Sequence, residues 1–175
     1  MNIKKHIPNL LTLGNLFSGT VATIFAVQGK FTEAALFVVI GILFDFLDGF
    51  AARLLNVSGE LGKQLDSLAD MVTFGVVPGF IMARLIQESL GLDFPPREVF
   101  STEVLPYYLF GFLIPIFSAF RLAKFNLDTR QSDAFYGVPT PANTILILSF
   151  WLILVRHNRI QRKYWIYLAF PFWLL

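Results

Sequence analysis

Four aspartates in an otherwise apolar part of the chain are the residues best suited to chemistry. Asp45 and Asp48 lie three apart, Asp66 and Asp70 lie four apart, and long apolar runs flank both pairs. Carboxylates beside membrane-grade apolar segments are costly, so they mark functional sites by default. Residues three or four apart share a helix face, so each pair can point in one direction. Four neighbouring carboxylates repel one another unless cations compensate, and oxygen ligands without nearby His or Cys suit Mg²⁺, Mn²⁺ or Ca²⁺ rather than Zn²⁺.

Small residues accompany both pairs of carboxylates. At about 100° per residue, Gly49 and Ala52 share the face of the first pair, and Gly62 and Thr73 share the face of the second. Small side chains let a ligand or another helix approach the backbone closely. Two divalent ions a few ångströms apart are the usual apparatus for displacement at phosphorus, and the fixed charge of Arg53 could hold a phosphate. The pattern predicts that the two faces gather four carboxylates around one or two metal ions.

The aspartates admit three other interpretations. They could be helix-end residues capped by neighbours or paired with Arg53, Lys63 and Arg121, but four on two facing stripes are hard to explain in this way. They could line a cation pathway, yet all four lie near one predicted membrane face and no acidic residue continues the path. A non-catalytic membrane scaffold would tolerate Asp→Asn changes across the cluster.

Composition places these residues in a membrane protein. The chain is 55% hydrophobic and 15% charged, with 20 phenylalanines and a mean hydropathy of +0.63, whereas soluble domains have about 45–50% apolar and about 25% charged residues. The net charge of +2 without a basic stripe argues against a nucleic-acid partner. The absence of cysteine excludes disulfides, thiolate metal sites and a cysteine nucleophile.

The elements that must position the aspartates are membrane helices. We expect an all-α, polytopic membrane bundle of about six transmembrane helices in one domain, 1–175, judged against about 20 apolar residues per crossing. The sixth is expected to be truncated, because it comprises only the 11 residues from 165 to 175. The predicted spans are Leu10–Gln28, Ala34–Leu55, Leu68–Ile86, Leu105–Phe125, Thr144–Val155 and the partial span Trp165–Leu175.

Two polar features adjoin these spans. Asn9, Thr12 and Asn15 lie on one face of the first span, where they could either contact a ligand or hydrogen-bond to other helices. The segment Arg121–Asn143 is predicted to be a structured surface loop on the same membrane face as the aspartates. Lysines and arginines number seven on one side and six on the other, which leaves the orientation undecided.

The aspartate segment as a whole resembles a known signature. The pattern Asp-x-x-Asp-Gly-x-x-Ala-Arg, eight residues, Gly, three residues, Asp, three residues, Asp runs from Asp45 to Asp70 without a departure, and it resembles the motif of the CDP-alcohol phosphotransferase family. Four further stretches are similar to the bacterial and archaeal phosphatidylserine synthases of that family: Ile7–Asn15, Gly62–Gly75, Phe120–Asn126 and Gly137–Ala142.

This resemblance implies a six-helix membrane core, usually a homodimer, in the cytoplasmic membrane with its active site facing the cytoplasm. It implies transfer of the phosphatidyl group from CDP-diacylglycerol to the hydroxyl of L-serine with release of CMP. Glycerol phosphate or an inositol compound is the alternative acceptor. Two divalent ions, Mg²⁺ or Mn²⁺, are expected as cofactors.

By motif position, the resemblance implies a role for individual residues. The metal ligands would be Asp45, Asp48, Asp66 and Asp70, and Asp70 would also take the proton from the acceptor hydroxyl. The residues expected to contact CDP-diacylglycerol are Asn9, Thr12, Gly49, Ala52, Arg53 and Gly62. Serine is small and zwitterionic, so we expect cations and amides near the end of the fourth helix to select it: Arg121, Lys124, Asn126 and Arg130.

Overall fold

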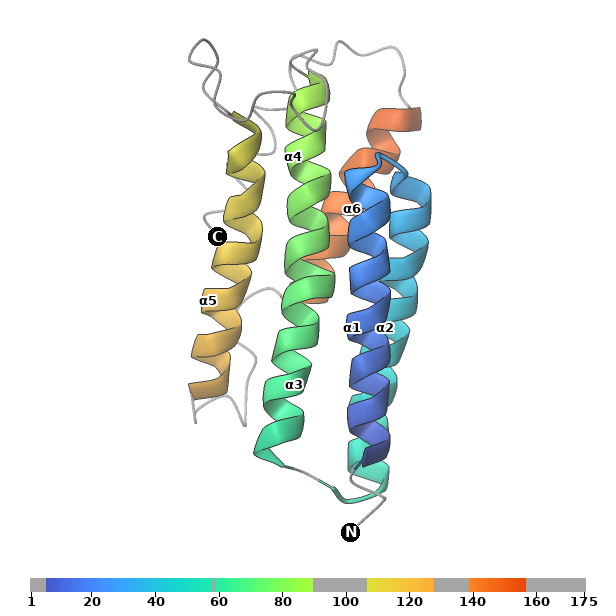
Figure 1. The fold of residues 1–175 in the computed structure, drawn as a ribbon, viewed down its shortest axis with the longest axis vertical. Helices are drawn as coiled ribbons and strands as arrows, with labels where there is room; N and C mark the ends of the chain where they lie inside the picture. Colours follow the sequence, from blue (N-terminus) through green and yellow to red (C-terminus); the bar gives the residue numbers. More distant parts are fainter. Residues whose placement is uncertain (1–5, 58, 90–106, 128–138, 157–175) are drawn as a thin grey trace.

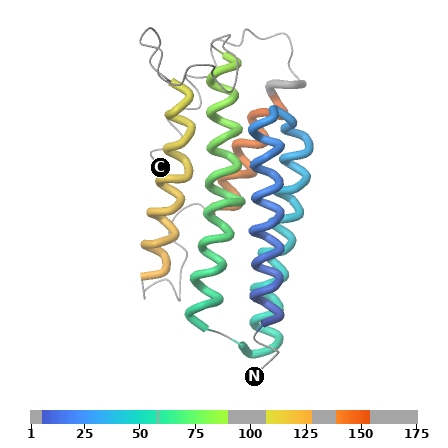
Figure 2. The backbone as a smooth tube through the Cα atoms, in the orientation of Figure 1, coloured from blue at the N-terminus to red at the C-terminus, as the bar shows by residue number. Residues whose placement is uncertain are grey.

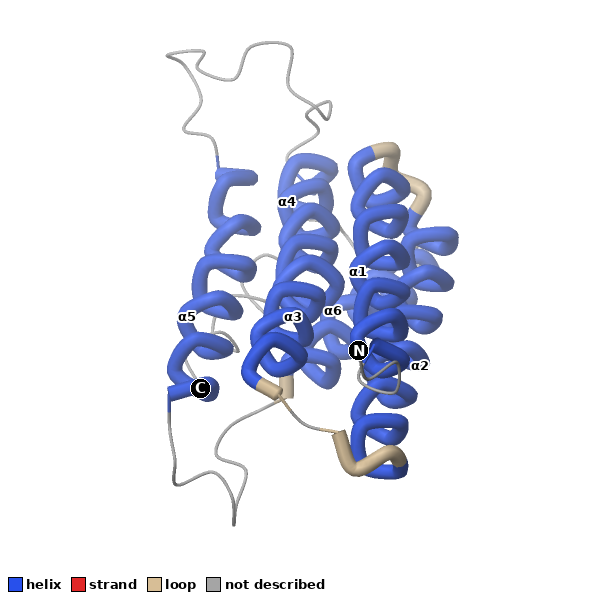
Figure 3. Tube along the Cα trace, turned by 60° about the horizontal axis from the view of Figure 1, so that its bottom comes forward, coloured by secondary structure: helices blue, strands red, loops and turns tan. Residues whose placement is uncertain are grey.

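The computed structural model describes residues 6–57, 59–89, 107–127 and 139–156, and the regular secondary structure of these residues consists of helices joined by short turns (Figures 1 and 3). The elements are α1 (His6–Val27), α2 (Phe31–Leu54), α3 (Glu60–Asp70), the π-helix η2 (Met71–Val76), α4 (Val77–Ser89), the 3₁₀-helix η3 (Tyr107–Phe112), α5 (Leu113–Leu127) and α6 (Thr140–Arg156). Because α3, η2 and α4 follow one another without interruption, as do η3 and α5, the described residues form five rods.

The rods are apolar enough to lie in a membrane. Four described helices have the length and composition to cross one: His6–Val27, Phe31–Leu54, Glu60–Ser89 and Tyr107–Leu127, with Thr140–Ile153 as a shorter apolar helix. Large apolar side chains such as Leu10 and Phe120 are about 70% exposed, as expected for a surface that faces lipid. The prediction of a membrane helical bundle is therefore confirmed, but the number of six is corrected: the described residues provide five helices. The expected sixth span, Trp165–Leu175, lies outside them.

Several predicted boundaries were wrong. The third helix begins at Glu60 rather than Leu68, because its first turns carry polar residues that a hydropathy window rejects. At its far end α4 continues to Ser89 into the expected polar loop. Of the expected loop Arg121–Asn143, residues 121–127 belong to α5 and residues 140–143 to α6, while 128–138 lie outside the described residues.

The rod formed by α3, η2 and α4 lies at the centre of the bundle. In Figures 1 and 3, α1 and α2 lie on one side of it and α5 on the other. In Figure 2 the beginning of α1, the end of α2, the beginning of α3 and the end of α5 all point toward the lower end of the bundle. The acidic pairs and the described part of the basic segment therefore share one end of the bundle, as predicted.

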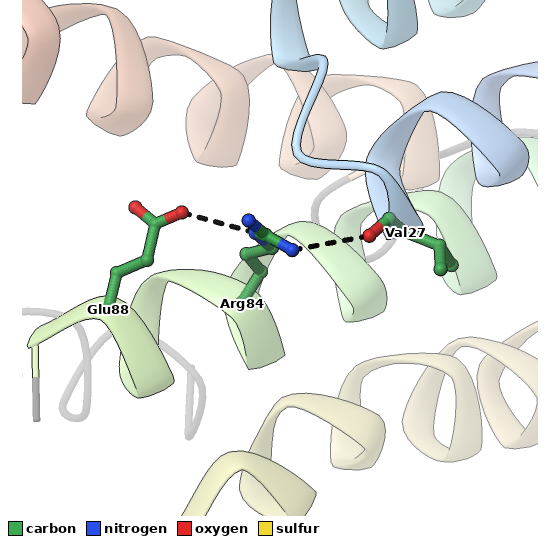
Figure 4. Close-up of polar contacts among 3 residues, drawn as sticks. All are labelled: Val27, Arg84 and Glu88. Atoms are coloured by element: carbon green, nitrogen blue, oxygen red, sulfur yellow. Dashed lines mark hydrogen bonds and ion pairs between the residues drawn. The ribbon is translucent and has the colours of Figure 1, made fainter. Parts of the chain in front are cut away.

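The opposite end is closed by a turn and an arginine (Figure 4). Gly29 adopts a φ of +75° between α1 and α2, a conformation that favours glycine. Arg84 of α4 donates from Nη1 to the carbonyl of Val27 at 3.4 Å and pairs through Nε with Glu88 at 3.1 Å. Because the last carbonyls of a helix lack intrahelical partners, this arginine both caps α1 and ties it to the central rod.

Small residues bring the helices together around η2. Thr73 packs between Gly19 of α1 and Gly41 of α2, so closely that neither glycine has room for a methyl group. A π-helix bonds i to i+5 and often accompanies a functional site. Thr144 of α6 donates to the carbonyl of Phe74 within η2 at 3.0 Å. The π-helix is thus held by α1, α2 and α6 directly after Asp70.

Candidate active site

The four aspartates lie together where α2 faces α3. Asp45, Asp48 and Asp66 each offer a carboxylate oxygen, and these oxygens all lie within 4.8 Å of one another. Asp70 lies close enough to Asp45, Asp48 and Asp66 for their charges to interact. The two helical faces predicted from spacing therefore do meet, and they bring carboxylates from both helices into one cluster.

Helix α1 provides the third side of the cluster. Thr12 Oγ1 donates to Asp48 Oδ2 at 2.6 Å, and Asn15 Nδ2 donates to Asp70 Oδ1 at 3.2 Å. Thr12 is 3% exposed and Asn15 is fully buried. Of the two alternatives for the polar face of the first helix, ligand contact and interhelical hydrogen bonding, the structure shows the second for Thr12 and Asn15. The acceptors of these hydrogen bonds are the aspartates themselves.

Among the described residues, Arg53 and Lys63 form no ion pair with the cluster. Arg53 donates instead to the carbonyl of Gly49 at 3.0 Å, and Lys63 donates to the carbonyl of Asn126 at 2.9 Å. This disfavours the interpretation that these cations neutralise the aspartates. Concentrated negative charge needs a compensating cation, so the electrostatics fit a metal site.

The donor atoms also fit a divalent ion. Asp66 Oδ1 is buried and has no hydrogen-bond partner, which is costly for a carboxylate oxygen unless a ligand completes it. Oxygen donors from three carboxylates suit Mg²⁺ or Mn²⁺. Asp45, Asp48 and Asp66 could therefore hold a metal ion. Asp70 is not one of the three mutually close residues, and its role as a further ligand stays a prediction.

The residues expected to contact CDP-diacylglycerol lie around the same cluster. A Cβ built on Gly62 would lie 3.2 Å from Asn9 Oδ1, so α1 and α3 approach each other here. A Cβ on Gly49 would meet only the Arg53 guanidinium, at 3.9 Å, which leaves open space above α2. Ala52 is half-buried beside it. Their proximity agrees with a shared binding surface, while their contacts with a substrate stay predictions.

The end of α5 is fastened to α3 beside Asp66. Asn126 Nδ2 donates to Ser67 Oγ at 2.8 Å, and Asn126 Oδ1 is buried without a partner. Arg121 is half-buried and Lys124 is exposed on the same helix, and Lys124 makes no hydrogen bond or ion pair with the four aspartates. Arg130 lies outside the described residues. Of the expected serine-binding residues, the structure thus brings Asn126 to the edge of the cluster.

Three residues at the site were not among the predicted site residues. Asn15, Ser67 and Thr73 connect the aspartate helix to α1 and α5. Asn15 was recognisable as part of a polar face three residues after Thr12, but its partner was not. Thr73 was visible on the helix face of Asp66 and Asp70, but its contact with α1 was not. Ser67 gave no signal, because small hydroxyl residues are frequent wherever membrane helices pack.

Comparison with known proteins places these features in a family. The family model for CDP-alcohol phosphatidyltransferase matches residues 5–175. Helicobacter pylori CDP-diacylglycerol–serine O-phosphatidyltransferase is 36% identical over 143 residues, covering 81% of this chain and 55% of that protein. The Bacillus subtilis enzyme of the same name is 34% identical over 147 residues, covering 83% of this chain and 76% of that protein.

An archaeal relative extends the comparison. Archaetidylserine synthase of Methanothermobacter thermautotrophicus is 32% identical over 160 residues, covering 87% of this chain and 62% of that protein. The chain thus spans little more than half the length of several curated relatives that it matches, and no solved structure gives a significant match. With a matching family model over nearly its whole length and the aspartate pattern in one cluster, the chain belongs to the CDP-alcohol phosphatidyltransferase family.

Proposed function

We propose that this protein transfers the phosphatidyl group of CDP-diacylglycerol to the hydroxyl of L-serine, forming phosphatidylserine and CMP. The observation that carries the proposal is the aspartate cluster. Three carboxylates lie within 4.8 Å of one another, with a buried, unpartnered oxygen on Asp66. The choice of serine is supported by relatives in Helicobacter and Bacillus whose names specify that acceptor.

In this reaction the serine hydroxyl oxygen forms a bond to the phosphorus that carries diacylglycerol, and the bond from that phosphorus to the CMP oxygen breaks. Asp70 takes the proton of the hydroxyl as the new bond forms, which is the general-base role. Asp45, Asp48 and Asp66 would hold one or two Mg²⁺ or Mn²⁺ ions, which when bound would neutralise the diphosphate and stabilise charge on the leaving group.

The surface around the cluster suits a lipid substrate. Phe46 and Leu47 lie between Asp45 and Asp48 on α2, and their side chains are 64% and 43% exposed. One turn of α2 therefore carries both lipid-facing side chains and carboxylates. The acyl chains of CDP-diacylglycerol could stay in the bilayer while its diphosphate reaches the aspartates, and Asn9, Thr12, Gly49, Ala52, Arg53 and Gly62 would line the nucleotide side.

The acceptor site is proposed at the end of α5. Asn126 Oδ1 is buried and unpartnered beside Ser67, so it could accept a hydrogen bond from the serine ammonium, while Arg121, Lys124 and Arg130 would attract the serine carboxylate. The other role for such cations is anchoring to anionic headgroups. Changing Arg121 or Lys124 to Ala should raise the serine KM more than the KM for CDP-diacylglycerol; an unchanged serine KM in both variants would place the acceptor site elsewhere.

We further propose that the protein acts as a homodimer in the cell membrane, with the cluster facing the cytoplasm, where CTP-derived nucleotides and serine are available. The reaction itself is tested by measuring CMP release from purified protein in mixed micelles that contain CDP-diacylglycerol, Mg²⁺ or Mn²⁺, and one acceptor from a panel of serine, glycerol phosphate and inositol compounds. Release that depends on serine supports the proposal. Release with another acceptor only would assign a different reaction, and metal flux across vesicles without CMP release would indicate a transporter.

The metal role is tested separately. Asp45→Asn and Asp66→Asn should abolish CMP release and also the rise in Tm that Mn²⁺ produces. Glu60→Gln is the matched control, because Glu60 is an exposed acidic residue at the start of the same helix as Asp66. If both aspartate variants kept activity and stabilisation by Mn²⁺, the metal site would be wrong. Asp70→Asn should retain CDP-diacylglycerol binding while losing transfer.

A further inference from the structure

Asn15 is a buried polar residue whose hydrogen bonds go beyond what the packing of α1 against its neighbours requires. Its side chain is fully buried, and its Nδ2 donates to Asp70 Oδ1 at 3.2 Å. Its backbone carbonyl accepts a hydrogen bond from Thr73 Oγ1, also at 3.2 Å. Its own Oδ1 has no hydrogen-bond partner. The asparagine is therefore held from both sides by the segment that contains the proposed base.

The geometry gives this amide a defined effect on Asp70. A carboxyl group can turn about its side-chain torsions, and a hydrogen bond to Oδ1 from a fixed donor selects one orientation. Asn15 is itself fixed, because Thr73 holds its backbone and no part of it reaches the surface. The second carboxylate oxygen of Asp70 is then left for other partners.

Building on the proposed function, we propose that Asn15 is the positioning residue of Asp70: its amide holds one carboxylate oxygen, so that the other is presented to the acceptor hydroxyl. Outer hydrogen-bond partners of site carboxylates typically contribute 10–100-fold to activity or metal affinity, and small misplacements of a reacting group can cost about 10²-fold.

The competing explanation is that Asn15 only joins α1 to α3. The two explanations differ in what a substitution changes. A positioning residue affects kcat while substrate binding and stability are kept, whereas a joining residue affects stability and binding together with kcat. Ser18 of α1 provides the matched control, since it is also buried, at 2% exposure, but donates only within its own helix, to the carbonyl of Gly14 at 2.9 Å.

The experiment compares wild type, Asn15→Leu, Asn15→Ala and Ser18→Ala. Leucine keeps the branching and the number of side-chain heavy atoms of asparagine without its donor, and alanine, which is smaller, cannot clash. For each protein we would measure serine-dependent CMP release, KM for both substrates, CMP affinity by calorimetry with Mn²⁺, and Tm in detergent. We expect both Asn15 variants to lose 10–100-fold in kcat, with KM values and CMP affinity within threefold of wild type, and Ser18→Ala to keep kcat within twofold.

Two outcomes would overturn the proposal. One is a kcat within twofold of wild type in a folded Asn15 variant. The other is a loss of folding, or a loss of CMP affinity parallel to kcat, in both variants, which would make Asn15 part of the scaffold. A wild-type protein that releases CMP only with another acceptor would refute the proposed function instead, and the comparison of Asn15 variants would then be made with that acceptor.

Discussion

The contact of Thr73 with two glycines determines how closely α1 and α2 approach η2, and it can be perturbed one methyl group at a time. A Cβ at Gly41 would lie 2.7 Å from Thr73 Cγ2 and 3.1 Å from Asn15 Oδ1. A Cβ at Gly19 would lie 2.9 Å from Thr73 Cα and would overlap its hydroxyl. Ordinary contact begins near 3.4 Å, so Gly41→Ala forces a separation of roughly 0.7 Å between α2 and η2.

The expected magnitude follows from that separation. Over-packing a well-packed site costs about 1–3 kcal/mol, and each kcal/mol lowers Tm by about 2–4 °C in a chain of this size, so Gly41→Ala should lower Tm by roughly 2–12 °C. Because Thr73 follows Asp70 within one turn, the same movement displaces the proposed base. Since a 1 Å misplacement can cost about 10²-fold, we expect kcat to fall roughly tenfold.

Thr73→Ser distinguishes the effects of the two glycine substitutions, Gly41→Ala and Gly19→Ala. Serine lacks Cγ2, which is the atom that the new methyl of Gly41→Ala would meet first, yet it keeps the hydroxyl that donates to the carbonyl of Asn15. The double variant with Gly41→Ala should therefore recover most of the lost Tm and kcat. The double variant with Gly19→Ala should not, because its methyl meets Thr73 Cα and Oγ1, which serine retains.

The assays are thermal unfolding in detergent and serine-dependent CMP release. Gly59→Ser is the control for adding a side chain: no atom lies within 4 Å of a Cβ at Gly59, and serine is a favoured residue at a helix N-cap such as this one. Its Tm should change by less than about 2 °C. If Thr73→Ser rescued both glycine variants equally, or neither, the packing around η2 would differ from the structure and the reasoning would be refuted.

Three further predictions concern single hydrogen bonds. Arg84→Met should lower stability by about 1–3 kcal/mol without changing kcat, since it uncaps α1 far from the aspartates; a kcat loss at full stability would contradict this. Thr144→Val should likewise destabilise by about 1–3 kcal/mol, measured as Tm, because it removes the buried hydrogen bond between α6 and the carbonyl of Phe74 in η2. Thr12→Val should raise the Mn²⁺ concentration needed for activity and for thermal stabilisation by about 10–100-fold, because Asp48 loses its hydrogen-bond partner. The control Thr20→Val removes an exposed hydroxyl that is bonded within α1, and it should leave both Mn²⁺ requirements unchanged. Equal effects of the two substitutions would remove the proposed role of Thr12.

The spacing of the aspartates was sufficient to predict their cluster. Pairs three and four apart must each share a helix face, and a polar face flanked by apolar runs can only turn inward. The membrane class was also predictable, because the chain is 55% hydrophobic and only 15% charged, and the structure leaves large apolar side chains such as Phe17 and Leu36 exposed. The start of the third helix at Glu60 was not predictable from hydropathy, since Lys63 and Gln64 lower the hydropathy of a segment that is nevertheless amphipathic and helical.

The partners of the aspartates could not be predicted either. Thr12 and Asn15 were visible as a polar face, but whether such a face meets a ligand or another helix depends on the relative rotation of helices far apart in sequence. The anchoring of Asn126 to Ser67 depends in the same way on the placement of α5 against α3. The periodicity within one helix carries no information on how that helix is rotated or placed relative to the others.

The π-helix Met71–Val76 also sets the rotational phase between the two halves of the central rod. An α-helix turns about 100° per residue, and bonding from i to i+5 accommodates about one extra residue without breaking the rod. Relative to the packed face of α4, Asp66 and Asp70 therefore point in a different direction from the one they would have in an uninterrupted α-helix. The difference is about the rotation of one residue. Deleting one residue here would leave a continuous apolar helix that still spans a membrane, yet both carboxylates would point away from α2. The direction of the acidic pair thus depends on helical phase, which length and hydropathy do not record.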